Sequence, residues 1–121
     1  AVGSSNNFGN KDKSSYQMDY SNSKEAIREA ELDISEGTDM IIVKPGLPYL
    51  DIISKLNQKF DIPIFAYQVS GEYSMIMNAI NNGLLDRSVI LETLTSFKRA
   101  GCSGILTYFA PIVSKILNED K

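Results

Sequence analysis

Three stretches of the chain are short and almost continuously apolar. They are Asp39 to Val43, Ile62 to Ser70 and Gly104 to Phe109. Each is too short for a surface helix, and runs of this kind are typical of strands that are buried on both faces of a parallel sheet. We therefore predict three strands at these positions.

Apolar residues recur at helical spacing in the segments around these strands. Ile27, Ala30 and Ile34, for example, fall on one face of a helix that Gly37 would end. Proline, glycine and capping residues bound the other helical segments in a similar way. The predicted helices are Ser23 to Glu36, one that starts at Pro48, one around Ile76 that breaks at Gly83, one from Asp86 to Gly101, and one that starts near Pro111.

The order of these elements is one helix followed by three strand–helix units, with an extra helix in the middle unit. Alternation of this kind predicts an α/β fold with three parallel strands, right-handed crossovers and flanking helices. A sheet of three strands leaves two open edges, which tend to pair with other strands. The sheet is therefore expected to be incomplete, either as part of a larger closed barrel or as part of an assembly of several chains.

The N-terminal stretch AVGSSNNFGNKDKSS is rich in Gly, Ser, Asn and Lys and contains almost no apolar residues. This composition predicts a loop or tail. We interpret residues 1–121 as a segment of one domain, with a loop at 1–21 and strand–helix units at 22–121. Because the chain begins with Ala1 rather than Met, we expect it to be a piece of a longer polypeptide.

Composition and charge exclude several classes of function. The 121 residues suffice for one modest domain, and the apolar fraction of 43% and charged fraction of 22% are ordinary for a globular protein. A net charge of -3 favours neither a nucleic acid nor a membrane as partner, and no apolar run is long enough to span a membrane. The chain has no His and a single Cys, Cys102, so it cannot by itself supply a histidine triad, a histidine-ligated metal or an intrachain disulfide.

Each predicted strand ends in polar residues that are capable of chemistry. These are Lys44, then Gln68 to Ser70, and then Thr107 with Tyr108. The carboxyl ends of parallel strands meet at one edge, where active sites form in β/α barrels and in open α/β sheets. We therefore expect these side chains to converge on one pocket.

Lys44 is the strongest candidate in this group. Pro45 ends the strand, and Gly46 is expected to allow close approach to a ligand. A lysine at the rim of an apolar core loses hydration, which favours its neutral amine, and a neutral amine can form a Schiff base with a ketone or aldehyde. The hydroxyls of Ser70 and Tyr108 could then hold a substrate carboxylate.

Local features leave a plainer interpretation open for each of these residues. Lys44 could be a solvated rim residue, and Ser70 could start a turn or cap the following helix. Tyr108 could be a core residue with its hydroxyl at the surface.

Three longer segments resemble one enzyme family. They are YQMDYSNSKEAIREAELDISEGTDMIIVKPGLPYLDII, AYQVSGEYSMI and FKRAG…ILTYFAP. In this order and spacing they resemble the porphobilinogen synthases, also called 5-aminolevulinate dehydratases. The resemblance runs from Phe8 to about Leu117, and the segments MIIVKPG and YQVSGEY are its most specific part.

The resemblance implies that the chain is the C-terminal part of a TIM (β/α)8 barrel, with the last three strands and their helices. The family condenses two molecules of 5-aminolevulinate to porphobilinogen through two lysine Schiff bases, in the biosynthesis of haem and other tetrapyrroles. Lys44 matches one Schiff-base lysine, and Ser70 and Tyr108 match the residues that bind the carboxylate of that substrate. Gln17 and Lys13 match the residues that face the carboxylate of the second substrate. Many members have arginine at the position of Lys13, and lysine cannot make its bidentate contact.

The resemblance also implies a lid, a metal and an assembly. The stretch Gly3 to Ser15 resembles the lid that closes over bound substrate. Glu29 matches a carboxylate that anchors an allosteric magnesium between subunits in some members, and it lies off the apolar face of its predicted helix. The family is usually a homo-octamer. The second Schiff-base lysine, a lid arginine and the active-site zinc or magnesium ligands would lie upstream, so this chain alone is expected to be inactive.

Two other functions fit parts of the pattern. A non-catalytic binding or assembly module could keep the carboxylate pocket without turnover, and a class I aldolase-like enzyme could use Lys44 for a different reaction. The VSGEY and TYFAP segments argue against the aldolase, because its local chemistry does not require them. The reaction of the family takes place in the cytoplasm or in a plastid, and this segment does not distinguish the two.

Overall fold

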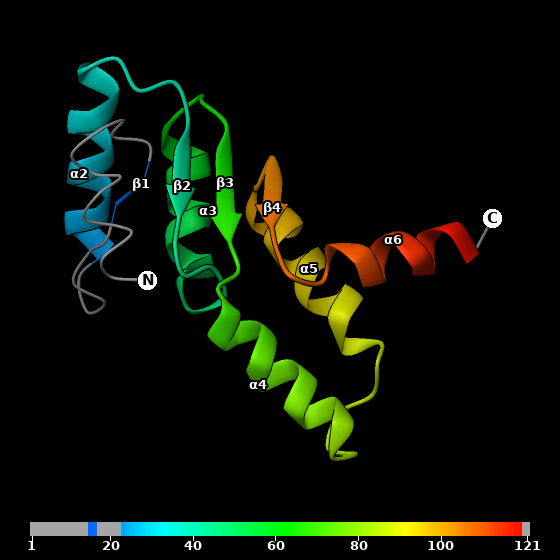
Figure 1. Cartoon of the computed structure of the whole chain (residues 1–121). Helices are drawn as coiled ribbons and strands as arrows, with labels where there is room; N and C mark the ends of the chain where they lie inside the picture. Colours follow the sequence, from blue (N-terminus) through cyan, green and yellow to red (C-terminus); the bar gives the residue numbers. More distant parts are fainter. Residues whose placement is uncertain (1–14, 17–22, 120–121) are drawn as a thin grey trace.

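Four parallel strands form one sheet in the order β1-β2-β3-β4 (Figure 1). The computed structural model describes residues 15–16 and 23–119. The strands are β1 (Ser15–Tyr16), β2 (Ile41–Val43), β3 (Ile64–Tyr67) and β4 (Gly104–Leu106). The three predicted strands are confirmed in place and are shorter than predicted, while β1 is an additional short strand inside the segment that was interpreted as a loop.

Helices alternate with the strands, and the predicted helices are all present. They are α2 (Ser23–Ser35), the 3-10 helix η1 (Leu47–Tyr49), α3 (Leu50–Lys59), α4 (Ser70–Asn81), α5 (Val89–Ala100) and α6 (Ala110–Glu119). Gly101 ends α5 in the left-handed region, with φ of 118°, as expected of a C-terminal glycine. Within the described part of the chain, no helix has both the length and the apolar character needed to cross a membrane.

Two predicted boundaries are wrong. The second strand ends at Tyr67 rather than Ser70, and Ser70 is the first residue of α4. Asp86 does not begin α5, which starts at Val89. Instead, an Asp86 carboxylate oxygen accepts the backbone N–H of Ser88 at 3.1 Å, in a turn just before the helix. Hydrogen bonds from Ser88 hold the pKa of Asp86 below its usual value.

The two faces of the sheet lie in different surroundings. Ile41 and Val43 of β2 are buried, and so are their neighbours Ile64 and Ala66 in β3. The residues that alternate with them are half-buried, because successive strand residues point to opposite faces. Helices α3 and α5 lie together on one side of the sheet (Figure 1). Among the described residues α3 and α5 cover one face and leave the other half-buried, so burial on both faces stays a prediction.

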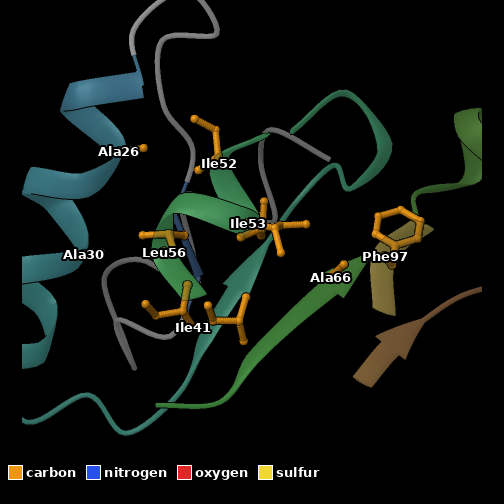
Figure 2. Packing of buried hydrophobic residues seen from close by; sticks show 10 residues of the cluster. Ala26, Ala30, Ile41, Ile52, Ile53, Leu56, Ala66 and Phe97 are labelled. Carbon is orange, nitrogen blue, oxygen red and sulfur yellow. The ribbon is translucent and has the colours of Figure 1, made fainter. Parts of the chain in front are cut away.

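The main core fills the space between the sheet and its helices (Figure 2). Ile53 and Leu56 of α3 and Phe97 of α5 are fully buried there, and Figure 2 shows Phe97 beside Ala66 of β3. Small residues bring α2 close to the same core, because Ala26 and Ala30 are its fully buried positions. Removing one of the large side chains would leave a cavity, which typically costs about 2–5 kcal/mol.

A second, smaller cluster joins α4 to the rest of the molecule. It consists of Ile76 of α4, Ile90 of α5 and Phe109, which follows β4. The helix α6 has no fully buried residue and runs away from the sheet (Figure 1). An apolar groove of about 470 Å³ lies between α5, β4 and α6, and its lining includes Leu94, Ile105, Val113 and Leu117.

Gly46 follows β2 and packs against the buried ring of Phe97. A Cβ atom placed on Gly46 would lie 2.5 Å from Cε1 and 2.8 Å from Cζ of that ring. Its φ of -93° is open to any residue, so close packing and not backbone conformation requires the glycine. In the described structure Gly46 approaches α5 closely, and its expected approach to a ligand stays a prediction.

Gly46→Ala is expected to destabilise the protein by about 1–3 kcal/mol, because the added methyl group overpacks the core beside Phe97. The matched control is Gly71→Ala, since no atom lies within 4 Å of a Cβ placed on Gly71. Thermal unfolding of the full-length protein that carries this segment measures both effects. Equal melting temperatures for Gly46→Ala and the wild type would contradict the packing argument.

Candidate active site

Lys44 directly follows β2, at the carboxyl edge of the sheet. Its side chain is half-buried, and its Nζ lies 4.9 Å from the centroid of the Tyr67 ring at the end of β3. A cation in this position is attracted to the aromatic face, typically by about 0.5–1 kcal/mol at exposed sites. The alternation of the strands puts Lys44 and Tyr67 on the same half-buried face. A half-buried side chain at the end of the strand fits both interpretations of Lys44, as a solvated rim residue and as a Schiff-base lysine, and both stay predictions.

Tyr67 is joined to Tyr108, which lies just after β4. A side-chain hydrogen bond with Tyr108 is the main cause that raises the pKa of Tyr67 above its usual value. The electrostatic interaction between the two phenols and partial burial raise it further. Both tyrosines line a pocket of about 160 Å³ together with Leu106 and Thr107. The Lys44 amine and the Tyr108 hydroxyl are thus linked through Tyr67.

Tyr108 is 53% exposed, so the alternative of a core tyrosine is wrong. Its ring nevertheless has a fixed neighbour, because its centroid lies 5.7 Å from that of Tyr73 in α4. Tyr73 in turn lies 4.7 Å from the buried ring of Phe109. Tilted aromatic pairs at these distances are favourable. Tyr108 is therefore presented to the open face of the sheet by a short stack of rings.

Ser70 is exposed at the first position of α4, three residues beyond Tyr67. The N-cap of this helix is Val69, so the alternative of Ser70 as an N-cap residue is wrong. Among the described residues, no hydrogen bond joins the Ser70 side chain to Lys44 or Tyr108. Ser70 does lie where the positive end of the α4 dipole attracts anions, which suits a group that would bind a carboxylate.

Gln68 and Thr107 hold the ends of β3 and β4 together. Oε1 of Gln68 accepts a hydrogen bond from Oγ1 of Thr107, and the same Oγ1 accepts the backbone N–H of Phe109 at 3.0 Å. Gln68 is fully buried, and its Nε2 has no partner among the described residues. Their role in the described structure is to fix the loop that carries Tyr108.

Two residues that the sequence analysis did not single out belong to this site. Tyr67 lies between Lys44 and Tyr108, and the period of two along β3 could have indicated that it shares their face. The carboxylate of Glu72 accepts backbone N–H groups from Gly46, Leu47 and Val69. A signal for Glu72 was its place three residues after Val69, where a carboxylate commonly caps a helix.

Three predicted site residues lie away from this cluster or outside the described structure. Lys13 and Gln17 fall outside the described residues, as does most of the predicted lid. Glu29 is exposed on α2, as expected for a residue off the apolar face. Within the described part of the chain, no three His, Cys, Asp or Glu side chains gather where a metal ion could be held.

The family model named "Delta-aminolevulinic acid dehydratase" matches residues 1–116 of the chain. The chain belongs to the delta-aminolevulinic acid dehydratase family. The dehydratase of Rhodobacter capsulatus is 54% identical over 107 residues, which cover 88% of this chain and 32% of that protein. The dehydratase of Methanothermus sociabilis is 57% identical over 117 residues, which cover 96% of this chain and 36% of that protein.

A solved structure of the dehydratase from Toxoplasma gondii ME49 has the same fold in the matched region. Its TM-score to this chain is 0.84 at 51% identity, and the match covers 88% of this chain and 30% of that one. That structure is a complex with the reaction product porphobilinogen. The chain thus spans about a third of the length of these dehydratases.

Cys102 lies in the connection between α5 and β4 and takes no part in this cluster. It is half-buried, and burial raises the pKa of its thiol to about 11. At neutral pH the group is therefore protonated, whereas the thiolate is the form that attacks electrophiles and binds metals.

Alkylation of Cys102 by iodoacetamide is expected to be slow at about pH 8 and to keep rising until about pH 11, because the rate follows the thiolate fraction. Unfolding in urea returns the thiol to its ordinary pKa of about 8.5, so the alkylation rate at about pH 8 should increase. Peptide mass spectrometry of the Cys102 peptide measures both rates. Equal rates in the folded and unfolded protein would contradict the effect of burial.

Proposed function

We propose that this chain is the C-terminal part of a porphobilinogen synthase, and that Lys44 forms one of the two substrate Schiff bases. The complete enzyme, a lyase of tetrapyrrole biosynthesis, condenses two molecules of 5-aminolevulinate to porphobilinogen. The observation that carries the proposal is the position of the Lys44 amine, 4.9 Å from the Tyr67 ring that is bonded to Tyr108. Membership of the dehydratase family supports it.

We infer that the sheet is the last part of a TIM barrel. Its parallel strands carry helices on one face, as the strands of such a barrel do. The outer edge of β4, the apolar groove beside it and the half-exposed helix α6 are surfaces that the rest of the polypeptide would cover. The half-buried face with Lys44 and Tyr67 would then line the barrel interior.

The chemistry follows from the surroundings of the amine. Nζ of Lys44 attacks the ketone carbon of 5-aminolevulinate, and the resulting carbinolamine loses water to leave an imine. The Tyr67 ring lies 4.9 Å from the amine and covers one side of it, which keeps water from that side. Excluding water also protects the imine from hydrolysis.

The substrate carboxylate would bind on the other side of this cluster. The hydroxyls of Tyr108 and Ser70 supply hydrogen-bond donors, and the N-terminal end of α4 adds a partial positive charge worth about 0.3–1 kcal/mol. Lys13 and Gln17 would face the carboxylate of the second substrate, under a lid formed by the residues before β1. These two roles rest on the resemblance of the N-terminal segment to the family.

One substrate site is not sufficient for a condensation of two molecules. The second Schiff-base lysine and the active-site metal ligands would come from the part of the polypeptide that precedes this segment. The isolated segment is therefore proposed to be inactive. Within the complete enzyme we expect a homo-octamer, in which the exposed carboxylate of Glu29 is one ligand of an allosteric magnesium at a subunit contact. A single carboxylate fits Mg²⁺, which keeps several of its waters.

Incubation of the full-length protein with 5-aminolevulinate and borohydride is expected to label Lys44, because hydride reduces the imine to a stable secondary amine. Lys44→Ala should lower porphobilinogen formation by several orders of magnitude, since the covalent intermediate cannot form. Lys98→Ala, at an exposed lysine of α5, is the matched control and should retain activity. Normal turnover by Lys44→Ala would overturn the proposal, and a binding module would give no label and no product.

Added magnesium is expected to stimulate the full-length enzyme, and Glu29→Gln should remove this stimulation because the neutral amide is a weaker ligand for a hard cation. Glu31→Gln is the matched control on the same helix, where it removes only a surface ion pair with Lys59 at 3.3 Å. Porphobilinogen formation over a magnesium titration is the measurement. Superimposable titration curves for Glu29→Gln and wild type would refute the role of Glu29.

A further inference from the structure

Glu72 is a charged residue inside the molecule, with only 3% of its surface exposed. Its Oε1 accepts the N–H of Leu47 at 2.7 Å. Its Oε2 accepts two more N–H groups, from Val69 at 2.8 Å and from Gly46 at 3.1 Å. A buried carboxylate is tolerated only where such bonds replace its lost hydration, and here three backbone donors do so.

The three donors come from two different loops. Gly46 and Leu47 belong to the loop that follows β2 and Lys44. They lie 26 and 25 residues before Glu72 in the sequence. Val69 belongs to the loop that follows β3 and immediately precedes Ser70. The carboxylate therefore ties together the two loops that carry the Schiff-base lysine and one of the proposed carboxylate-binding residues.

The loop after β2 is held from its other side as well. The close packing of Gly46 on Phe97 leaves no room for the loop to move towards α5. Glu72 holds the same residue through its N–H. These two contacts restrain the backbone two residues beyond Lys44 from both sides, which limits where the amine can lie relative to Tyr67 and Tyr108.

We propose that Glu72 is a positioning residue for Schiff-base formation, because its carboxylate sets the distance between the Lys44 loop and the Ser70 loop. This inference rests on the proposed function of Lys44. Glu72 does not touch the substrate, and it acts by holding the amine and the carboxylate site in register. Misplacement of reacting groups by about 1 Å can lower a rate by about 100-fold.

A purely local role of Glu72 must be distinguished from this one. Its bond to the N–H of Val69 caps the first turn of α4, three residues away, and would stabilise the helix without any effect on Lys44. Glu72→Asp separates the two roles. Aspartate is also a good acceptor at a helix N-terminus, but it is one methylene group shorter and is expected to lose the bonds to Gly46 and Leu47.

The experiment measures the rate at which borohydride traps 5-aminolevulinate on Lys44 in the full-length enzyme, divided by the amount of folded, assembled protein. The variants are Glu72→Asp and Glu72→Gln, and the matched control is Glu92→Gln, at an exposed carboxylate in the first turn of α5. We expect both Glu72 variants to trap about 10- to 100-fold more slowly at saturating substrate, and the control to trap at the wild-type rate. Circular dichroism confirms that Glu72→Asp keeps its helices.

The outcomes separate the two proposals. If wild type and Glu92→Gln label Lys44 and Glu72→Asp labels it equally fast, Glu72 is only a helix cap and the positioning role is overturned. If the wild type does not label Lys44, the proposed function fails and the positioning role fails with it. Where Glu72→Gln does not fold, the rate of Glu72→Asp alone decides between a positioning residue and a cap.

Discussion

The carboxylate of Glu72 is the constraint on which the arrangement of the candidate site depends. Burying a charge is unfavourable unless hydrogen bonds satisfy it, and in this chain the donors are three backbone N–H groups from two loops. The loops after β2 and β3 can therefore not be placed independently of each other or of α4. Gly46 adds a second restraint, because the ring of Phe97 occupies the space that a side chain would need.

The alternation of strand residues turns this restraint into a site. The buried residues of β2 and β3 point to the helices and form part of the core; they are Ile41, Val43, Ile64 and Ala66. The residues between them therefore point to the other face. Lys44 and Tyr67 share that half-buried face, and Tyr108 joins them through its hydrogen bond. The same pleat that builds the core thus gathers an amine and two phenols at the carboxyl edge of the sheet, where parallel α/β folds place their chemistry.

The chain spans only part of the length of its relatives, which explains why several of its surfaces are open. The matched region covers about a third of the length of these dehydratases. The structure of one of them is a complex with the reaction product porphobilinogen. A sheet whose described helices cover one face, a groove beside β4 and a helix without buried residues are the features of an incomplete layer.

Much of this molecule was determined by its sequence alone, and the reason is local. Short apolar runs and helical periodicity predicted the strands and helices in order, and strand ends predicted Lys44 and Tyr108, because these signals depend on neighbouring residues. Only the tertiary structure decided that Ser70 begins α4, that Gly46 packs on Phe97, and that Tyr67 and Glu72 belong to the site. The partners of Gly46, Tyr67 and Glu72 lie more than twenty positions away in the sequence, and a local pattern does not specify such partners.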